Sequence, residues 1–421
     1  MATMWILFTL LVGTACSCHL HIDHSSEPNS LSLMIERNYT SIISNNMANR
    51  HLSRNLTHHH KTALINVRIF DGTTLQAPST LIIDGDRIGP RCHDTSPHPC
   101  GATSVYDAQG KALLPGLIDS HAHPLTISDL ESLTRAGVTT AVLAHCPDPA
   151  LCASLSNQPP GLTSIVTGSF IATTPDSQHA LTLLSPNQTN LLIRSLNDTA
   201  PFIANQVAHG AEFIKIIGSA PGPGLSQDMQ SALVAAAHRH NRQAIAHASS
   251  ALAYTQAAQA GVDQIHHAPL DVPLPASFVT PHVRSFKAVC PTLTMMRGIA
   301  SLGSGNFSVA LESVRMLHEA GVKVLAGTDA NGNGRTPFQV RFGTSLHDEL
   351  ENLVLSRLTP VQALNAAARV PAEVWGLMDK GVIREGKMAD LILVDGDPSV
   401  DVRDVRRVVK VWARGVEFVG I

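Results

Sequence analysis

The central part of the sequence repeats one pattern, in which a short apolar run is followed by an amphipathic stretch. The runs are LLPGLIDSHAHP, VTTAVLAHC, TSIVTGSFI, EFIKIIGS, QAIAHAS, VDQIHHAP, KAVCPTL and VKVLAGTDA. Helical patterns such as DMQSALVAAAHRHN and SVALESVRMLHEAG lie between them, and the second ends at Gly321, as a helix C-cap would. Eight strand–helix units predict an α/β fold in which the strands form a closed, parallel (β/α)₈ TIM barrel.

Strand-like segments also lie on both sides of this region. They are TALINVRIF, STLIIDGDRIG and SVYDAQGKALL before it, and GVIREGKMADLILVDGDP and VRRVVKVWARGVEFVG after it. The chain has 421 residues, more than the roughly 250 that one barrel needs. We therefore predict a barrel over residues 115–375 and a small composite β-sandwich domain, to which residues 62–114 and 376–421 both contribute.

The N-terminal region has the features of an exported protein. An apolar run over residues 4–12 is followed by small residues, which predicts a signal peptide over residues 1–18 that is too short to cross a bilayer. Residues 19–61 are polar and without periodicity, as in a flexible lead-in. Asn-x-Ser/Thr sequons begin at Asn38, Asn55, Asn187, Asn197 and Asn306. We expect a glycosylated protein that is secreted or resides in the lumen of the secretory pathway.

The cysteines agree with export. Cys16 and Cys18 lie where the signal peptide would be cleaved. The segments CHDTSPHPC (92–100) and CPDPALC (146–152) are short loops able to close as local disulfides, although sequence alone does not set the connectivity. Cys290 lies in an apolar run and is predicted to be a buried free thiol.

Several of the predicted barrel strands carry a metal-ligating residue type. The carboxyl ends of all barrel strands meet at one mouth, so residues far apart in the sequence can gather there. Alternate residues of a strand face the same way, so His121 and His123 can bind one ion together. The candidates are His121, His123, Lys215, His247, His267 and Asp329.

The segments PGLIDSHAHP, GAEFIKIIGS, AIAHAS, GVDQIHH, AGTDA, LTPVQALNAA and GVIREGKMADLILVDGDP resemble the amidohydrolase superfamily, in particular its imidazolonepropionase-like and prolidase-like members. The resemblance covers residues 63 to 421. It implies a metal-dependent hydrolase with two divalent ions, of which Zn²⁺ is the first choice for such ligands. One ion would be held by His121, His123 and Asp329, the other by His247 and His267, and Lys215, carboxylated by CO₂, would bridge them.

A carboxylated lysine has a physical reason at such a site. A protonated Lys215 would be repelled by two dications and would have no lone pair to offer, whereas its carbamate is an anion that offsets their charge. Without the surrounding motif, Lys215 would be an ordinary strand-end lysine paired with Glu212. The resemblance further implies that a metal-bound hydroxide attacks the substrate and that Asp329 passes the proton to the leaving nitrogen. Lys215 and Asp329 are thus the predicted catalytic residues.

Other histidines are predicted to lie outside the ligand set. Alternation along a strand lets only one of His266 and His267 face inward, and the GVD-x-I-x-H frame selects His267 as the ligand. His266 would then point outward or contact the ligands from behind, and His347 would form a hydrogen bond near the site. Structural or solvated roles are expected for His145, His209, His238, His240 and His318.

The favoured reaction is hydrolysis of an amide C–N bond in a small molecule such as an N-acyl amino acid, a dipeptide or an amide-containing secondary metabolite. A lactonase or esterase could use the same metal site, because the ions do not distinguish C–N from C–O cleavage. A mononuclear deaminase is disfavoured because Ser250 stands where such enzymes carry Glu. A non-catalytic metal-binding barrel would show lost ligands, and none of the six positions is lost.

The remaining features limit the partners. A net charge of −3 and a pI of about 6.7 give no electrostatic reason for binding nucleic acid or, after signal cleavage, a membrane, so a small-molecule substrate is expected. The sequence does not set whether the chain forms a homo-oligomer. Val142 and Leu143 replace the Arg-Asp pair of prolidase-like members, and the stretch between His123 and Gly137 is much shorter than is usual for them. These departures predict a mouth that is more open or differently walled. No Gly-rich cradle for a phosphate is evident.

Overall fold

The computed structural model describes residues 60–420, except 185–187, 189–190, 276, 279–285, 333, 335 and 337. The predicted signal peptide, nearly all of the lead-in and the sequons at Asn38, Asn55 and Asn187 lie outside the described residues. None of the helices within the described ranges is long and apolar enough to cross a membrane.

The larger sheet is parallel and its strands follow one another in chain order. They are β6 (Leu117–His123), β7 (Val138–Leu143), β8 (Ser164–Ala172), β9 (Phe213–Ile217), β10 (Gln243–His247), β11 (Gln264–His266), β12 (Ala288–Cys290), β13 (Lys323–Val324) and β14 (Ala330–Asn331). Most of their residues are buried on both faces, as expected for a parallel sheet covered by helices.

The two end strands of this sheet belong to one stretch of chain, residues 323–331. β13 pairs with β12, and β14 pairs with β6. Between them, the amide of Leu325 donates to the carbonyl of Val289 (2.8 Å), and the amide of Ser120 donates to the carbonyl of Ala326 (2.9 Å). The stretch therefore acts as the eighth strand and closes the sheet, which confirms the predicted (β/α)₈ barrel.

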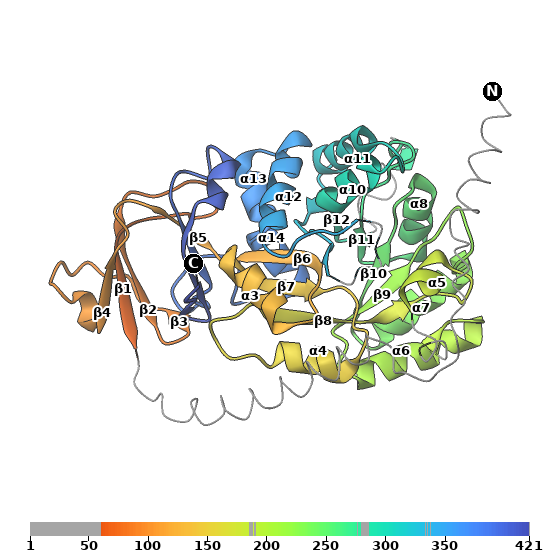
Figure 1. Cartoon of the computed structure of the whole chain (residues 1–421), viewed down its shortest axis with the longest axis horizontal. Helices are drawn as coiled ribbons and strands as arrows, with labels where there is room; N and C mark the ends of the chain where they lie inside the picture. Colours follow the sequence, from red (N-terminus) through yellow and green to blue (C-terminus); the bar gives the residue numbers. More distant parts are fainter. Residues whose placement is uncertain are drawn as a thin grey trace, which may run out of the picture. The chain divides into compact units, whose positions relative to one another are not determined.

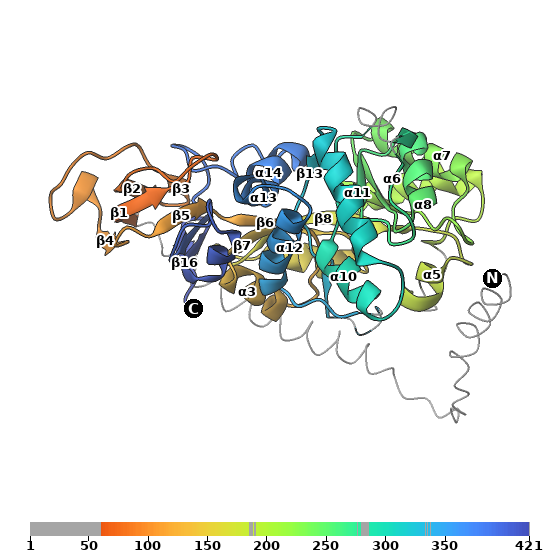
Figure 2. The same ribbon diagram turned by 90° about the horizontal axis from the view of Figure 1, so that it is seen from above.

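Helices surround the barrel strands (Figures 1 and 2). They are α3 (Ile127–Arg135), α4 (Pro149–Ser156), α5 (Gln178–Leu183), α6 (Thr199–Ala208), α7 (Gln227–Arg239), α8 (Ala251–Ala260), α10 (Leu293–Ser301), α11 (Phe307–Glu319), α12 (Thr344–Leu355), α13 (Pro360–Ala366) and α14 (Arg369–Trp375). Local sequence explains their ends. Thr126 and Asp129 form a capping box at the start of α3, and Gly321 has a φ of 86° just after α11, close to its predicted end.

A second, mixed sheet is built from both sides of the barrel in sequence. Its strands are β1 (Lys61–Ile69), β2 (Ser79–Asp84), β3 (Arg87–Ile88), β4 (Ser104–Asp107), β5 (Ala112–Pro115), β15 (Leu391–Val394), β16 (Val408–Ala413) and β17 (Val416–Glu417). The N- and C-terminal contributions join where β5 and β15 pair antiparallel. We call residues 60–115 and 376–420 the β-domain.

The β-domain has a core of its own. A bulge in β1 between Leu64 and Val67 lets the sheet bend there, and Asn66 has a φ of 53°. Leu64 and Leu81 of one half share a buried cluster with Leu393 and Trp412 of the other. The predicted composite β-sandwich is therefore confirmed.

The described cysteines pair within their own loops. Cys92 bonds Cys100, and Cys146 bonds Cys152, whereas Cys290 is a buried free thiol. Both short loops thus close as local disulfides, as the sequence suggested.

Candidate metal centre

The predicted ligands are carried by barrel strands or directly follow them: His121 and His123 on β6, Lys215 on β9, His247 on β10, His267 after β11, and Asp329 between β13 and β14. His267 and Asp329 have φ values of 73° and 57°. These left-handed conformations are unusual for non-glycine residues and often mark functional sites. The backbone there leaves the extended path just where it carries a predicted ligand.

One group of donor atoms surrounds Asp329. Its Oδ1 lies 2.9 Å from His123 Nε2 and 3.5 Å from His121 Nε2. The ligand atoms of these three residues all lie within 4.8 Å of one another, which is close enough to share a single cation. This geometry agrees with the His-x-His argument, because both imidazoles come from one face of β6.

The second pair of histidines adjoins this group. The rings of His247 and His267 are 4.3 Å apart, and the rings of His267 and His121 are 4.9 Å apart. His267 Nδ1 lies 3.9 Å from Asp329 Oδ2 and 2.8 Å from the hydroxyl of Thr292. Asp329 therefore stands between His123 and His267, one from each predicted ligand group.

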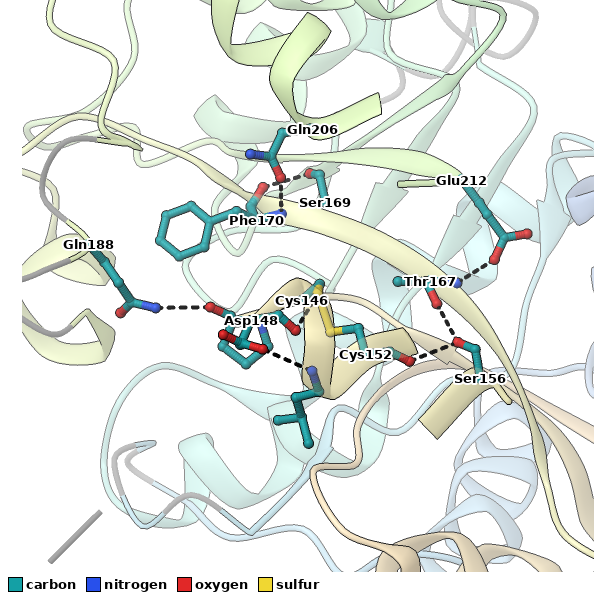
Figure 3. The surroundings of a disulfide bond; sticks show 12 residues. Cys146, Asp148, Cys152, Ser156, Thr167, Ser169, Phe170, Gln188, Gln206 and Glu212 are labelled. Atoms are coloured by element: carbon teal, nitrogen blue, oxygen red, sulfur yellow. Dashed lines mark hydrogen bonds between the residues drawn. A yellow bond between two sulfur atoms is a disulfide. The ribbon is translucent and has the colours of Figure 1, made fainter. Parts of the chain in front are cut away.

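Lys215 points into the same cluster. Its Nζ lies 3.4 Å from His121 Nε2, and the residue is only 3% exposed. Burial lowers the pKa of Lys215 to about 8, which favours the neutral amine that reacts with CO₂. The carboxylate of Glu212 instead accepts a hydrogen bond from the amide of Thr167 (2.7 Å), which argues against an ordinary Lys215–Glu212 pair (Figure 3).

The donor set fits metal ions. Burial holds the pKa values of His121, His247 and His267 well below their usual range, so these imidazoles are neutral and keep a lone pair. Neutral imidazoles with a carboxylate are typical zinc ligands. The backbone amide of His121 and the amide and hydroxyl of Thr328 all donate to Asp119, at 3.1, 3.0 and 2.7 Å. This buried carboxylate, not singled out from the sequence, ties β6 to the closing stretch.

His266 does not follow the alternation argument. Its Nδ1 lies 2.8 Å from His121 Nδ1, and its ring is 4.9 Å from that of His121, the same separation as for His267. His266 thus contacts a predicted ligand from behind, one of the two places expected for it, but the argument that only one of the two neighbours can face inward does not hold. Alternation applies to extended backbone, and His267 lies past the end of β11 with its positive φ.

Sequence reasoning missed His179. It lies on α5, its ring is 4.4 Å from that of His247, and burial lowers its pKa to about 4. His179 is a helix residue, so it falls outside the strand-end pattern from which the ligands were predicted. The sequence did contain one indication of this helix. The side chain of Ser177 accepts a hydrogen bond from the amide of Ala180, as a helix N-cap does, and His179 lies in the first turn that follows.

Two of the other singled-out histidines, His347 and His238, have described hydrogen bonds to groups outside the predicted ligand set. His347 Nε2 lies 2.9 Å from the carbonyl of Ala136, at the end of α3, so its described bond ties α12 to α3. His145 follows β7 with its ring 5.2 Å from that of Phe170. His238 pairs with Asp263 (2.8 Å), in line with a structural role.

The Cys146–Cys152 loop supports the position of Lys215 indirectly. The amide of Cys146 donates to the carbonyl of Ser169 on β8 (3.0 Å), and the hydroxyl of Ser169 accepts from the amide of Lys215 (2.9 Å). Figure 3 shows the disulfide beside β8, with Ser169 and Phe170 above it. The loop after the second strand is thereby coupled to the strand that carries Lys215.

Two sequons lie in described, exposed positions. Asn197 is in a short 3₁₀ helix, η4 (Leu196–Asp198), and Asn306 caps the start of α11. Their glycosylation stays a prediction. Ser250, at the position that argued against deamination, caps α8 by accepting from the amide of Ala253.

A closed parallel barrel with imidazoles, a carboxylate and a buried lysine converging beyond its strands defines a metal-dependent barrel hydrolase. The sequence confirms this class at the level of family. The model of the amidohydrolase family matches residues 112–417, and the chain belongs to that family.

Solved structures share the fold. A Xaa-Pro dipeptidase with bound methionine is 20% identical, with a TM-score of 0.72 over 86% of this chain and 100% of that one. A putative prolidase from Bifidobacterium longum is 23% identical (TM-score 0.70; 85% and 94% covered), and the ochratoxinase of A. niger is 16% identical (TM-score 0.70; 86% and 96%). No curated protein matches the sequence significantly.

Proposed function

We propose that this amidohydrolase is a secreted enzyme with two divalent metal ions that cleaves an amide C–N bond of a small molecule, such as an N-acyl amino acid, a dipeptide or an amide-containing secondary metabolite. One observation carries the proposal: the buried Lys215 faces His121 within the histidine–aspartate cluster. A lysine in that place makes chemical sense as a carbamate bridging two cations, since its ammonium form would repel them.

The proposed ligand sets follow the geometry. His121, His123 and Asp329, whose donor atoms lie within 4.8 Å of one another, would hold one ion, and His247 and His267, whose rings are 4.3 Å apart, would hold the other. When bound, zinc ions in such a set lower the pKa of water toward neutrality and polarise a carbonyl oxygen. Solved structures of the same fold include a Xaa-Pro dipeptidase and a putative prolidase, which favours an amide over an ester as the substrate bond.

The protein's own residues then position and move protons. Asp329 has one carboxylate oxygen near His123 and the other near His267, so it stands between the two ligand pairs. From there it can accept a proton from the attacking water and deliver it to the leaving nitrogen. His121 and His267, kept neutral by burial, add no positive charge that would hold the proton back.

Export is the second part of the proposal. The two disulfides among the described cysteines are typical of oxidising compartments. Together with the signal-like N-terminus and the exposed sequons at Asn197 and Asn306, they favour a secreted glycoprotein. Its partner would be a small-molecule substrate rather than nucleic acid or a membrane.

Metal analysis and substrate profiling test the function. Purified wild-type protein should contain about two ions per chain, and it should hydrolyse at least one member of a panel of N-acyl amino acids, dipeptides and lactones until a chelator is added. Lys215→Met should lose both metal and turnover, whereas Lys287→Met, an exposed change on the same barrel, should lose neither. Wild-type protein that binds no metal would refute the proposal, and turnover of lactones alone would replace the amide with an ester.

A further inference from the structure

The imidazole of His121 has different neighbours on its two nitrogens. Its Nε2 faces the cluster, 3.4 Å from Lys215 Nζ and 3.5 Å from Asp329 Oδ1. Its Nδ1 faces away from them, 2.8 Å from Nδ1 of His266. Both histidines are 1% exposed or less, so water does not compete for this contact.

Behind His266 a line of polar side chains continues through the barrel. Nε2 of His266 lies 3.2 Å from Oε1 of Gln264, and Nε2 of Gln264 donates to Oε1 of Gln243 at 2.9 Å. Nε2 of Gln243 donates to the carbonyl of Val374 at 2.7 Å. We call His266, Gln264 and Gln243 the neutral relay, because none of these side chains carries a formal charge when the imidazole is neutral.

The direction of every bond in the relay follows from one requirement. If Nε2 of His121 gives its lone pair to a cation, the proton of the neutral ring must be on Nδ1. His266 must then accept at Nδ1 and carry its own proton on Nε2, which points at the Gln264 oxygen. Each amide in turn accepts with its oxygen and donates with its nitrogen, and the line ends on a backbone carbonyl.

We propose that His266 is a positioning residue that holds His121 in the tautomer able to bind the cation, with the neutral relay behind it. This inference rests on the proposed function, since it concerns a ligand of the proposed centre. Ligating histidines usually donate their second N–H to a carboxylate, a backbone carbonyl or water. Here the acceptor is a neutral imidazole, so it adds no negative charge and leaves the bound cation more strongly electrophilic.

Cys290 offers a competing explanation for the same contact. Its Sγ and one nitrogen each of His121 and His266 lie within 4.8 Å of one another, so the three could hold a cation of their own. Two observations favour the relay instead. The 2.8 Å between the nitrogens is a normal hydrogen-bond length, and His266 is bonded onward to Gln264 by its other nitrogen.

The decisive comparison is between two substitutions of His266. His266→Leu removes the acceptor and should weaken zinc binding about 10- to 100-fold, as loss of such a partner generally does. His266→Asn places an oxygen close to where Nδ1 stood and should recover most of this loss. Zinc affinity is measured on the full chain by competition with a chromogenic chelator. Thermal unfolding of the metal-free proteins shows whether each variant is folded.

Two further variants keep the test decisive. Gln264→Met breaks the relay one bond further from the ion and should lower zinc affinity by a smaller factor than His266→Leu. It also carries the test if His266→Leu does not fold. Cys290→Ala should bind zinc as wild-type does, and a loss as large as that of His266→Leu would assign the contact to a cation and overturn the relay.

The outcomes separate this inference from the proposed function. If wild-type protein binds two ions and His266→Leu and His266→Asn both bind them with unchanged affinity, the relay is refuted and the metal-dependent hydrolase stands. Equal losses in the two variants would also refute it, because a merely structural role gives no rescue by Asn. If wild-type protein binds no zinc, the metal-centre proposal itself fails.

Discussion

The barrel and the β-domain differ in the number of their buried polar side chains and in how these side chains are paired. Among the described residues, the β-domain contributes one buried polar or charged side chain, Asp390, and the barrel contributes all the others. Some of these, such as Thr134 and Thr163, bond one another and are structural. The two regions differ most in whether each buried charged group has hydrogen-bond partners and a counter-charge.

Both carboxylate oxygens of Asp390 accept hydrogen bonds. Lys380 donates to one carboxylate oxygen at 2.6 Å, and the amide of Arg414 donates to the other at 2.7 Å. Lys380 also donates to the hydroxyls of Thr140 and Ser164, both at 3.0 Å. This ion pair links the β-domain to barrel strands β7 and β8 with every charge compensated.

The candidate metal centre lacks such compensation. Lys215 has its described side-chain hydrogen bond with a nitrogen of His121, and Asp329 lies beside His121 and His267, whose pKa values burial holds well below their usual range. Buried polar and charged groups cost free energy unless they are paired. A cluster of this kind is therefore expected in a protein only where it binds a ligand. A fully satisfied buried charge therefore marks architecture, and an incompletely satisfied one marks function.

The largest expected effect comes from changing the aspartate in the barrel. Asp329→Asn keeps the size of the side chain but removes the proton acceptor, so kcat on the substrate found by profiling should fall about 10²- to 10⁴-fold. Metal content and thermal stability should stay close to wild-type. Activity within a few-fold of wild-type would show that Asp329 does not carry the proton.

The same substitution in the β-domain should act on stability instead. Asp390→Asn leaves Lys380, whose side chain is 11% exposed, without its counter-charge, and removing one partner of a pair that is mostly buried costs up to about 3 kcal/mol. Denaturant unfolding should show this loss in the free energy of unfolding, while kcat per folded molecule stays the same. A catalytic defect in Asp390→Asn with unchanged stability would contradict the division between the two regions.

Sequence alone predicted the barrel because its information is local and repeated. Most of the apolar runs are followed by a described helix, and several of these helices begin at a side-chain cap such as Thr126, Ser226 or Ser250, so the eight units could be counted without tertiary knowledge. The composite β-domain was also foreseen, since strand patterns stood at both ends of the chain. His121 and His123 were placed together because period-two geometry holds inside β6.

What the sequence could not give was the geometry beyond the strand ends. His266 and His267 both face His121 because the backbone turns at His267, and no propensity predicts that positive φ. His179 reaches His247 from a helix, a contact set by how α5 packs rather than by any strand pattern. Sequence periodicity fails where regular structure stops, which in a barrel is where the site begins.

Buried imidazoles should make the stability of the barrel depend on pH. Burial lowers the pKa of His347 from 6.5 to about 4, so above pH 6.5 the residue is neutral in both folded and unfolded chains. As pH falls from 6.5 toward 4, the unfolded chain takes up the proton first and unfolding becomes easier. The expected loss from this residue is about 3 kcal/mol.

Removing the imidazole tests this expectation. The metal-free form of His347→Gln should lose less stability than metal-free wild-type between pH 6.5 and 4, measured by denaturant unfolding at each pH. His98→Gln, which removes an exposed histidine of the β-domain, is the control for losing a histidine. Parallel stability curves for wild-type and His347→Gln would show that the buried ring is not the source of the pH dependence.

The two disulfides give the smallest and most discriminating comparison. The Cys92–Cys100 bridge closes a loop in the β-domain with a sequence separation of 8, and the Cys146–Cys152 bridge closes one in the barrel with a separation of 6. Loops this short constrain the unfolded chain similarly, so replacing either pair by serine should cost about 2 kcal/mol.

Only the barrel bridge should also affect the proposed metal centre. Opening it frees the backbone whose amide, at Cys146, holds Ser169, and the hydroxyl of Ser169 accepts from the amide of Lys215. Zinc affinity should therefore fall several-fold in the double serine variant at 146 and 152, and stay at the wild-type value in the variant at 92 and 100. Both variants lose a similar amount of stability, so a difference in zinc affinity between them would come from the Ser169 link. Equal zinc affinity in the two variants would mean that Lys215 is held by β9 alone.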